Sequence, residues 1–290
     1  MPKIGVVLSG CASKGAYEIG CLAAIDDYFG PGAITCVSSS SIGAMIGQLY
    51  GMGRKEGLIQ AFRDMDSGKY GRYILAFTNN KTAVQALEKL LEAPNAPAYE
   101  HYVTLWNYSA SSVEYKPFHA LPPEKLPVYL RAAMCFPIFS RGLVIDGQRY
   151  LDGAVLDNIP VYPLKDKDLD YIFCIYFDNA RYQFEDPEFD KKVIKLHDFP
   201  NQDRLEVLFC DPGSYDKMYA YGYDYTTSLL QKLFADPARD AVIAAIAHHN
   251  ATNAPAYKHR LTADVVLSGI NVVSKKYSKA LSTREKVKTK

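Results

Sequence analysis

The sequence predicts an α/β fold in which a mainly parallel central sheet lies between two layers of helices. Short apolar runs typical of strands alternate with longer segments that carry apolar residues at helical spacing, up to about residue 235. The first unit is the strand pattern Ile4–Leu8 and the helical pattern over 14–25. The second is Ile34–Val37, followed by four serines and a helical pattern over 42–51. Two strand–turn–helix units in succession indicate βαβ topology.

The same alternation continues along the chain. Further strand patterns lie at 102–108, 149–151, 171–176 and 205–209, and further helix patterns at 58–62, 81–91, 124–134 and 214–234. No Pro/Gly/Ser-rich linker and no repeat interrupts them, so we expect a single domain over residues 1–274. Residues 64–100 mix Tyr and Phe with Gly, Asn and Pro, which predicts either a lid or a less regular insertion.

The composition is that of an ordinary globular protein. The chain has 290 residues, of which 48% are hydrophobic and 22% charged, and this excludes collagen, a long coiled coil and wholesale disorder. No apolar run is long enough to span a bilayer, and the first apolar run is too short for a secretory signal. The six cysteines form no Cys-x-x-Cys pair, so we expect buried free thiols in a cytoplasmic protein.

The formal net charge of +1 is the sum of two regions of opposite sign. The last sixteen residues, 275–290, carry seven Lys or Arg and one Glu, which is +6, so residues 1–274 sum to about −5. A total near zero gives no general attraction to nucleic acid. The basic tail is either a disordered solubilising segment or one attracted to anionic lipid.

The run of serines after the second strand pattern is the most informative segment. A nucleophilic serine in an α/β hydrolytic enzyme lies on a sharp strand-to-helix turn, where the residues two before and two after it must be small. Ser41 meets this condition, with Ser39 before it and Gly43 after it. Ser40 would place the β-branched Ile42 at the later position. The alternative is a polyserine turn that only caps the helix.

The loop after the first strand pattern is also rich in small residues. Such a loop lets backbone N–H groups point outward, as in an oxyanion hole or a phosphate cradle. A Walker loop is excluded because Ala16 stands where lysine is required, and a dinucleotide-binding fingerprint fails at Ala12. An ordinary tight turn is the alternative. Lys14 opposes the helix dipole at this position, which favours a specific role for it.

A candidate carboxylate lies at the end of a later strand pattern. Asp152 follows a short apolar run and precedes Gly153, so its side chain is expected to emerge in a loop beside the serine. The earlier pair Asp146-Gly147 is interpreted as a plain turn. The six histidines and the acidic residues show no metal-ligand spacing, so no metal or other cofactor is expected.

Taken together, the three segments resemble the patatin-like phospholipase family. The shared features are Lys14-Gly15 in the loop after the first strand, the serine turn after the second, and Asp152-Gly153-Ala154 with Asn158-Ile159-Pro160 downstream. The stretch 131–137 resembles the one that precedes the family's aspartate, and 220–224 resembles its late helix. The resemblance covers roughly residues 3–235.

This resemblance implies a serine lipid acyl hydrolase that works with a Ser–Asp dyad and without a catalytic histidine. By position, Ser41 would be the nucleophile and Asp152 its general base. The implied oxyanion hole consists of the backbone amides of Gly10, Cys11 and Ala12, and the implied supporting residues are Lys14, Gly15, Gly43 and Gly153. The expected partner is a lipid ester at a membrane surface, with the protein attached peripherally.

The chain departs from the family pattern at the turn and at the glycine loop. The family's three glycines are Gly10-Cys11-Ala12 here, and the first glycine of the serine turn is Ser39. A Cβ is unfavourable where the backbone needs a positive φ, and it narrows the space for a substrate carbonyl. These departures leave open lipid binding with weakened turnover. Acyl transfer to an alcohol also stays open, because it would use the same acyl-enzyme as hydrolysis.

Overall fold

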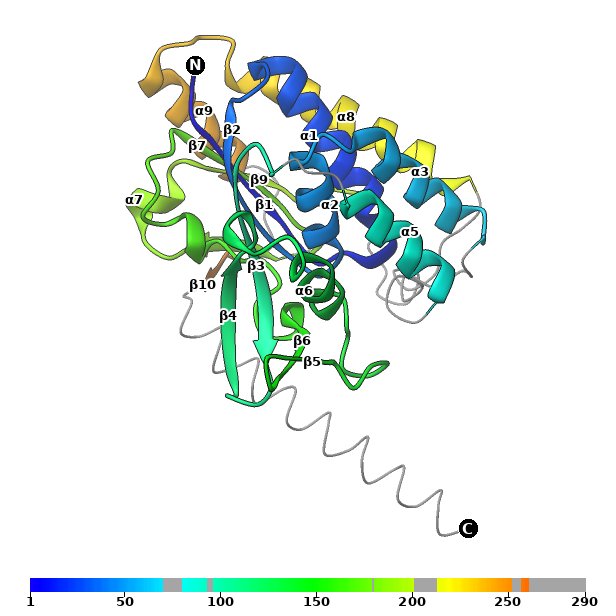
Figure 1. Cartoon of the computed structure of the whole chain (residues 1–290). Coiled ribbons are helices and arrows are strands. Elements are labelled where there is room, and N and C mark those ends of the chain that lie inside the picture. The colour runs from blue at the N-terminus through cyan, green and yellow to red at the C-terminus, as the bar shows by residue number, and fades with distance from the viewer. Residues whose placement is uncertain (70–79, 93–95, 179, 201–212, 252–256, 261–290) are drawn as a thin grey trace, which may run out of the picture.

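The computed structural model describes residues 1–69, 80–92, 96–178, 180–200, 213–251 and 257–260 (Figure 1). In these residues the central sheet has eight strands: β1 (Ile4–Leu8), β2 (Ile34–Ser40), β3 (Glu100–Asn107), β4 (Ser112–Pro117), β5 (Leu143–Ile145), β6 (Gln148–Asp152), β7 (Tyr171–Ile175) and β9 (Val193–Leu196). A separate two-stranded sheet pairs β8 (Arg181–Phe184) with β10 (Tyr257–Arg260).

The central sheet is parallel in its middle and antiparallel at one side. Its strand order is β5-β6-β3-β2-β1-β7-β9, and β4 also pairs with β3. Strands β3, β2, β1, β7 and β9 are all parallel to their neighbours in this series. Strands β4 and β6 run antiparallel to β3, and β5 runs antiparallel to β6. The predicted α/β fold with a mainly parallel sheet is confirmed.

Helices cover the sheet. Those longer than one turn in the described ranges are α1 (Gly15–Phe29), α2 (Ile42–Gly51), α3 (Lys55–Asp66), α5 (Lys81–Leu91), α6 (Leu126–Ala133), α8 (Ser214–Leu233) and α9 (Arg239–Ala251). Figure 1 shows α1, α2, α3, α5 and α8 gathered on one side of the sheet. None of these helices combines the length and the apolar composition that a bilayer-spanning helix requires.

Besides a small cluster that includes Trp106 and Leu151, the core has two parts, one on each face of the sheet, because successive side chains of a strand point to opposite faces. Val6 and Leu8 of β1 belong to the larger core beneath the helices, whereas Val7 belongs to the smaller one. The smaller core is covered by the segment 159–169, by β8 and by the short helix α7 (Pro187–Asp190). Burial on both faces explains why the parallel strands are continuous apolar runs.

Two glycines let α1 and α8 approach each other closely. A Cβ added at Gly20 would lie 2.2 Å from the carbonyl oxygen of Tyr219, and one at Gly222 would lie 2.3 Å from that of Tyr17. Both contacts are with backbone, which cannot move aside as a side chain can. The pair therefore fixes α8 against the helix that follows the Gly10 loop.

Most predicted elements are present, with bounds that match the patterns or differ from them by a few residues at either end. Strands β4, β5, β8, β9 and β10 and helices α7 and α9 are present in the structure but were not predicted. The predicted strand at 205–209, the tail 275–290 and residues 70–79 and 93–95 of the predicted lid or insertion lie outside the described residues. The described part of 64–100 contains the whole of α5. Each cysteine in the described part of the chain is a buried free thiol, as predicted.

Candidate active site

Ser41 occupies the sharp turn between β2 and α2. Its backbone has φ 53° and ψ −128°, a left-handed conformation that is strained for any residue other than glycine. Gly43 lies against β1, because a Cβ there would be 2.8 Å from the carbonyl oxygen of Leu8. The close approach of helix and strand therefore explains why a small residue stands two positions after Ser41.

The residue two positions before Ser41 is held by a buried hydrogen-bonded network. Ser39 Oγ lies 2.7 Å from Nε2 of His101, and Nδ1 of His101 lies 2.9 Å from Oε1 of Gln48. Burial lowers the pKa of His101 to about 3, so its ring is neutral. The Gln48 oxygen can only accept, so Nδ1 carries the proton and Nε2 accepts the hydroxyl proton of Ser39. Ser39 stands where the family pattern has glycine, and its hydroxyl is hydrogen-bonded to His101.

Asp152, at the end of β6, is in direct contact with Ser41. The Ser41 hydroxyl donates to Oδ2 of Asp152 at 2.6 Å, and Oδ1 accepts the backbone N–H of Ala154 at 2.9 Å. The carboxylate is only 1% exposed. Burial raises the pKa of Asp152 to about 7, and the hydrogen bonds from Ser41 and Ala154 oppose this rise. A carboxyl with this pKa exchanges a proton readily near neutral pH.

Strand β3 brings the two residues together across a long stretch of sequence. Thr104 of β3 is the register partner of Ser40 at the end of β2, and the next residue, Leu105, is the partner of Asp152 at the end of β6. Strand β4 occupies the other side of β3 along this length. Strands β2 and β6 therefore meet end to end on the same side of β3, with Ser41 and Asp152 at the junction.

The predicted oxyanion loop is held by an asparagine that was not among the predicted site residues. The backbone N–H of Gly10 donates to Oδ1 of Asn158 at 2.8 Å and to Oγ of Ser40 at 3.1 Å. Nδ2 of Asn158 donates back to the carbonyl oxygen of Gly10 at 3.1 Å. A Cβ at Gly10 would lie 2.9 Å from Cβ of Ser41. The amide of Gly10 is thus occupied by Asn158, in contrast to an open oxyanion-hole donor.

The other two predicted oxyanion residues lie at the start of the short turn η1 (Ala12–Lys14). Cys11 has φ −134°, and Ala12 has φ 49°, so the left-handed position in this loop falls on alanine. Within the described part of the chain, no hydrogen bond engages the backbone N–H of either residue. Both N–H groups are therefore without a hydrogen-bond partner among the described residues.

The thiol of Cys11 is held in its protonated form. Burial is the main cause that raises its pKa well above the ordinary value, and the nearby carboxyl of Glu18 raises it further. Glu18 itself is fully buried on α1, and this burial raises its own pKa well above the usual range. Since the thiolate is the reactive form of cysteine, Cys11 is an inert thiol at neutral pH.

The predicted supporting residues all have tightly packed positions. Lys14 is 5% exposed, and its Nζ lies 6.0 Å from the centre of the Phe177 ring. A Cβ at Gly15 would be 2.6 Å from Phe62, and one at Gly153 would be 2.5 Å from the backbone of Thr104. Gly153 therefore allows the chain after Asp152 to cross β3 without displacing it.

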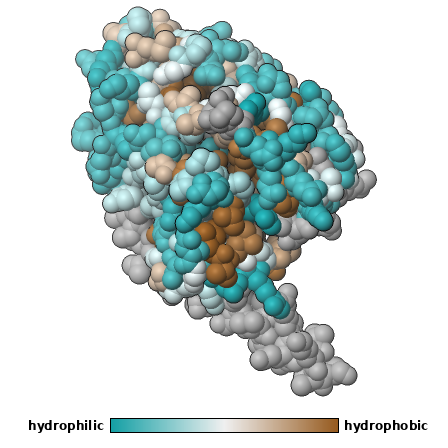
Figure 2. All heavy atoms as spheres, in the orientation of Figure 1, coloured by the Kyte–Doolittle hydropathy of each residue, from teal (hydrophilic) through white to brown (hydrophobic). Residues whose placement is uncertain are grey.

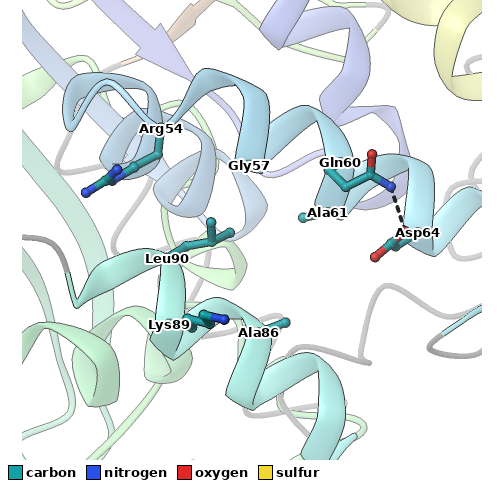
Figure 3. A pocket seen from close by; sticks show the side chains of 8 residues that line it. All are labelled: Arg54, Gly57, Gln60, Ala61, Asp64, Ala86, Lys89 and Leu90. Carbon is teal, nitrogen blue, oxygen red and sulfur yellow. Dashed lines mark hydrogen bonds between the residues drawn. The ribbon is translucent and has the colours of Figure 1, made fainter.

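A surface pocket of about 360 Å³ lies apart from these residues, between α3 and α5. Figure 3 shows its lining, in which Gln60 turns toward Asp64 and donates to it at 2.8 Å. None of the predicted site residues lines it. In the described residues there is also no cluster of three or more His, Cys, Asp or Glu placed to bind a metal ion.

Comparison with known proteins links the chain to one family. A family model described as patatin-like phospholipase matches residues 6–165, which include the Gly10 loop, Ser41 and Asp152. A search of curated proteins found no match. VipD from Legionella pneumophila is 13% identical with a TM-score of 0.44, over 86% of this chain and 74% of that chain. The type III effector protein ExoU is 13% identical with a TM-score of 0.38, over 99% of this chain and 63% of that chain.

Proposed function

The chain belongs to the patatin-like phospholipase family, and on this premise we propose that it is a serine hydrolase that cleaves carboxylic esters of lipids. The observation that carries the proposal is the 2.6 Å hydrogen bond from Ser41, on its strained turn, to the buried carboxylate of Asp152. A hydroxyl paired with a base inside a low-dielectric site is the arrangement that nucleophilic catalysis requires.

In the proposed reaction, Asp152 accepts the hydroxyl proton as Ser41 Oγ attacks the ester carbonyl carbon. The resulting tetrahedral intermediate collapses as Asp152 returns the proton to the departing alcohol, and an acyl-enzyme ester on Ser41 remains. A water molecule then gives a proton to Asp152 and attacks this ester. Collapse of the second intermediate releases the fatty acid and restores the Ser41 hydroxyl.

The negative charge of both intermediates would be stabilised by backbone amides beside Ser41. The N–H groups of Cys11 and Ala12 are the proposed donors, and the N-terminus of α2 directs its dipole to the same place. Gly10 would not donate a hydrogen bond to the intermediates, because its own N–H is bonded to Asn158. It would contribute only by its position in the loop. The proposed oxyanion hole therefore has two backbone donors, whereas the resemblance implied three.

The dyad proposal is tested by labelling the intact protein with a fluorophosphonate probe and by measuring hydrolysis of a soluble short-chain ester. We expect stoichiometric labelling at Ser41, and we expect Ser41→Ala to lose both labelling and hydrolysis. Ser38→Ala is the matched control, because Ser38 lies in the same serine run and its hydroxyl has no partner within the described residues. Unchanged hydrolysis in Ser41→Ala would refute the proposal.

A lipid panel then tests the substrate class. Wild type, Ser41→Ala and Asp152→Ala are compared on phospholipid, lysophospholipid and neutral lipid esters, with and without an added alcohol acceptor. Release of fatty acid identifies a hydrolase, whereas a new ester in the presence of acceptor identifies acyl transfer. Lipid binding without any Ser41-dependent product would assign the chain to a binding role and exclude the enzyme.

A further inference from the structure

Among the described residues, the exposed large aliphatic and phenylalanine side chains lie in one short segment, apart from Met1. Ile138, Phe139 and Val144 have exposed fractions of 57%, 44% and 60%. In the described part of the chain, every other large hydrophobic residue with comparable exposure is a tyrosine, except Met1. Figure 2 shows a hydrophobic area on the part of the surface where β5, β6 and α6 lie in Figure 1. A cluster of this kind marks a surface that contacts something apolar.

This segment is connected directly to the candidate active site. The backbone N–H of Asp152 donates to the carbonyl oxygen of Cys135 at 3.0 Å, three residues before Ile138. Three residues span at most about 11 Å of chain. On the other side, Val144 of β5 is the register partner of Arg149 in β6, the strand that ends at Asp152. Both ends of the segment are therefore anchored to structure that holds Asp152.

Cationic and aromatic groups accompany the apolar side chains. Arg141 is exposed, and Nη1 of Arg149 donates to the carbonyl oxygen of Arg141 at 2.8 Å. The nearby acid Asp146 is paired with Lys125 at 2.6 Å. Tyr108, which is 43% exposed, donates its backbone N–H to the carbonyl oxygen of Arg149. Apolar tips flanked by arginine and tyrosine suit the interface of a bilayer with anionic headgroups.

We propose that Ile138, Phe139 and Val144, together with Arg141 and Arg149, form a docking surface for an anionic lipid bilayer. The side chains enter the acyl boundary while the guanidinium groups contact headgroup phosphates. Docking at this surface holds the Ser41–Asp152 site at the membrane, where long-chain ester substrates reside. The role of docking in bringing the site to its substrate rests on the proposed function, whereas docking itself is measured without turnover.

The test is co-sedimentation with vesicles of phosphatidylcholine and phosphatidylserine, using the full chain with Ser41→Ala so that no lipid is consumed. Adding Ile138→Ser and Phe139→Ser is expected to lower the partition coefficient about tenfold or more, because each removes an exposed apolar side chain that docking would bury in the bilayer. Arg141→Gln is expected to lower the affinity for the vesicles and to make binding less sensitive to salt. Tyr28→Ser is the matched control: Tyr28 is 41% exposed, near the end of α1 opposite the Gly10 loop.

A fluorescent variant keeps the test independent of these substitutions. The chain has a single tryptophan, Trp106, which is 8% exposed. Phe139→Trp is expected to show a blue shift on vesicle addition and quenching by lipids with brominated acyl chains, beyond any change in the parent protein. Vesicle binding that ignores the Ile138/Phe139 double substitution, or a Phe139→Trp signal that ignores lipid, would overturn the proposal.

Activity separates this proposal from the proposed function. In the chain with native Ser41, the Ile138/Phe139 double variant is expected to hydrolyse a soluble short-chain ester at the parent rate and vesicle lipid about tenfold more slowly. If the parent hydrolyses no ester, the proposed function fails, while sedimentation still decides docking. If the double substitution instead dissociates a dimer and leaves vesicle binding intact, the surface belongs to a second copy and the docking proposal is wrong.

Discussion

Ala12, like Ser41, has a strained backbone near the site. Its φ of 49° lies in the left-handed region, which a Cβ disfavours by about 1–2 kcal/mol. We expect Ala12→Gly to raise the free energy of unfolding by about 0.5–1 kcal/mol, because glycine relieves this strain but enlarges the entropy of the unfolded chain. Urea titration measures the change.

The same substitution inside a helix provides the control for Ala12→Gly. Ala16 is buried within α1, where glycine is expected to destabilise by about 1 kcal/mol. If Ala12→Gly and Ala16→Gly destabilise to the same extent, positive φ at position 12 carries no strain in solution.

Asp152 sets the expected pH dependence of the proposed reaction. Burial raises its pKa to about 7, and only the carboxylate form accepts the Ser41 proton. We therefore expect kcat/KM for a soluble ester to rise with pH and to level off above about pH 8. Asp152→Asn is expected to lower kcat by about 10²–10⁴-fold. A rate that stays constant from about pH 5 to 9 would contradict a general-base role.

At the scale of elements, the contact between α1 and α8 depends on backbone approaching backbone. We expect Gly222→Ala to destabilise the protein by about 2 kcal/mol or more, because its Cβ would lie 2.3 Å from the carbonyl oxygen of Tyr17. Thermal unfolding measures the loss. Gly57→Ala in α3 is the control: its Cβ meets only the flexible end of Leu90, so its Tm should be equal or higher. Equal effects of the two substitutions would show that close helix contact is not the cause.

The sequence predicted the elements that are repetitive and apolar. The parallel strands and the helices beside them bury continuous faces, so their patterns are local and visible. Strand β4 (Ser112–Pro117) is half-buried along its whole length and shows no such pattern. Helix α9 buries only Val242, Ile246 and Asn250, which leaves its periodicity weak.

The parts of the site that depend on pairing between distant segments were not predictable. The rule of small neighbours selects Ser41 as the candidate nucleophile, but no local sequence pattern indicates the register of β3 against β2 and β6. The role of Asn158 was missed for the same reason. Asn158-Ile159-Pro160 was noticed as a motif, yet only the folded chain shows that its side chain bonds to Gly10.

At the scale of the whole molecule, two buried carboxyl groups couple stability to pH. Burial raises the pKa of both Asp152 and Glu18. Their protonated forms are favoured by folding, so this stability is complete below about pH 4 and is lost as pH rises through the folded pKa. For Asp152 that loss runs from about pH 4 to about pH 7 and is complete above this range.

We accordingly expect the Asp152→Asn/Glu18→Gln double variant to be more stable than the parent by about 2–4 kcal/mol at pH 8, and by little at pH 4. Denaturant unfolding at both pH values measures the difference. The exposed Glu124→Gln variant should match the parent within about 0.5 kcal/mol at each pH. An equal gain at pH 4 and pH 8 would show that charge burial is not the cause.

The end-to-end meeting of β2 and β6 beside β3 makes the distance between Ser41 and Asp152 independent of how much chain separates them. Insertions in the turn after β3 or in the segment before β5 leave that distance unchanged as long as β3 keeps its partners. A slip of one residue in β3, by contrast, would turn the neighbouring side chains to the opposite face. A chain misaligned in this way would keep its helices while losing the proposed Ser41–Asp152 activity. Catalytic rate is consequently a more sensitive reporter of correct strand pairing than any measure of secondary structure.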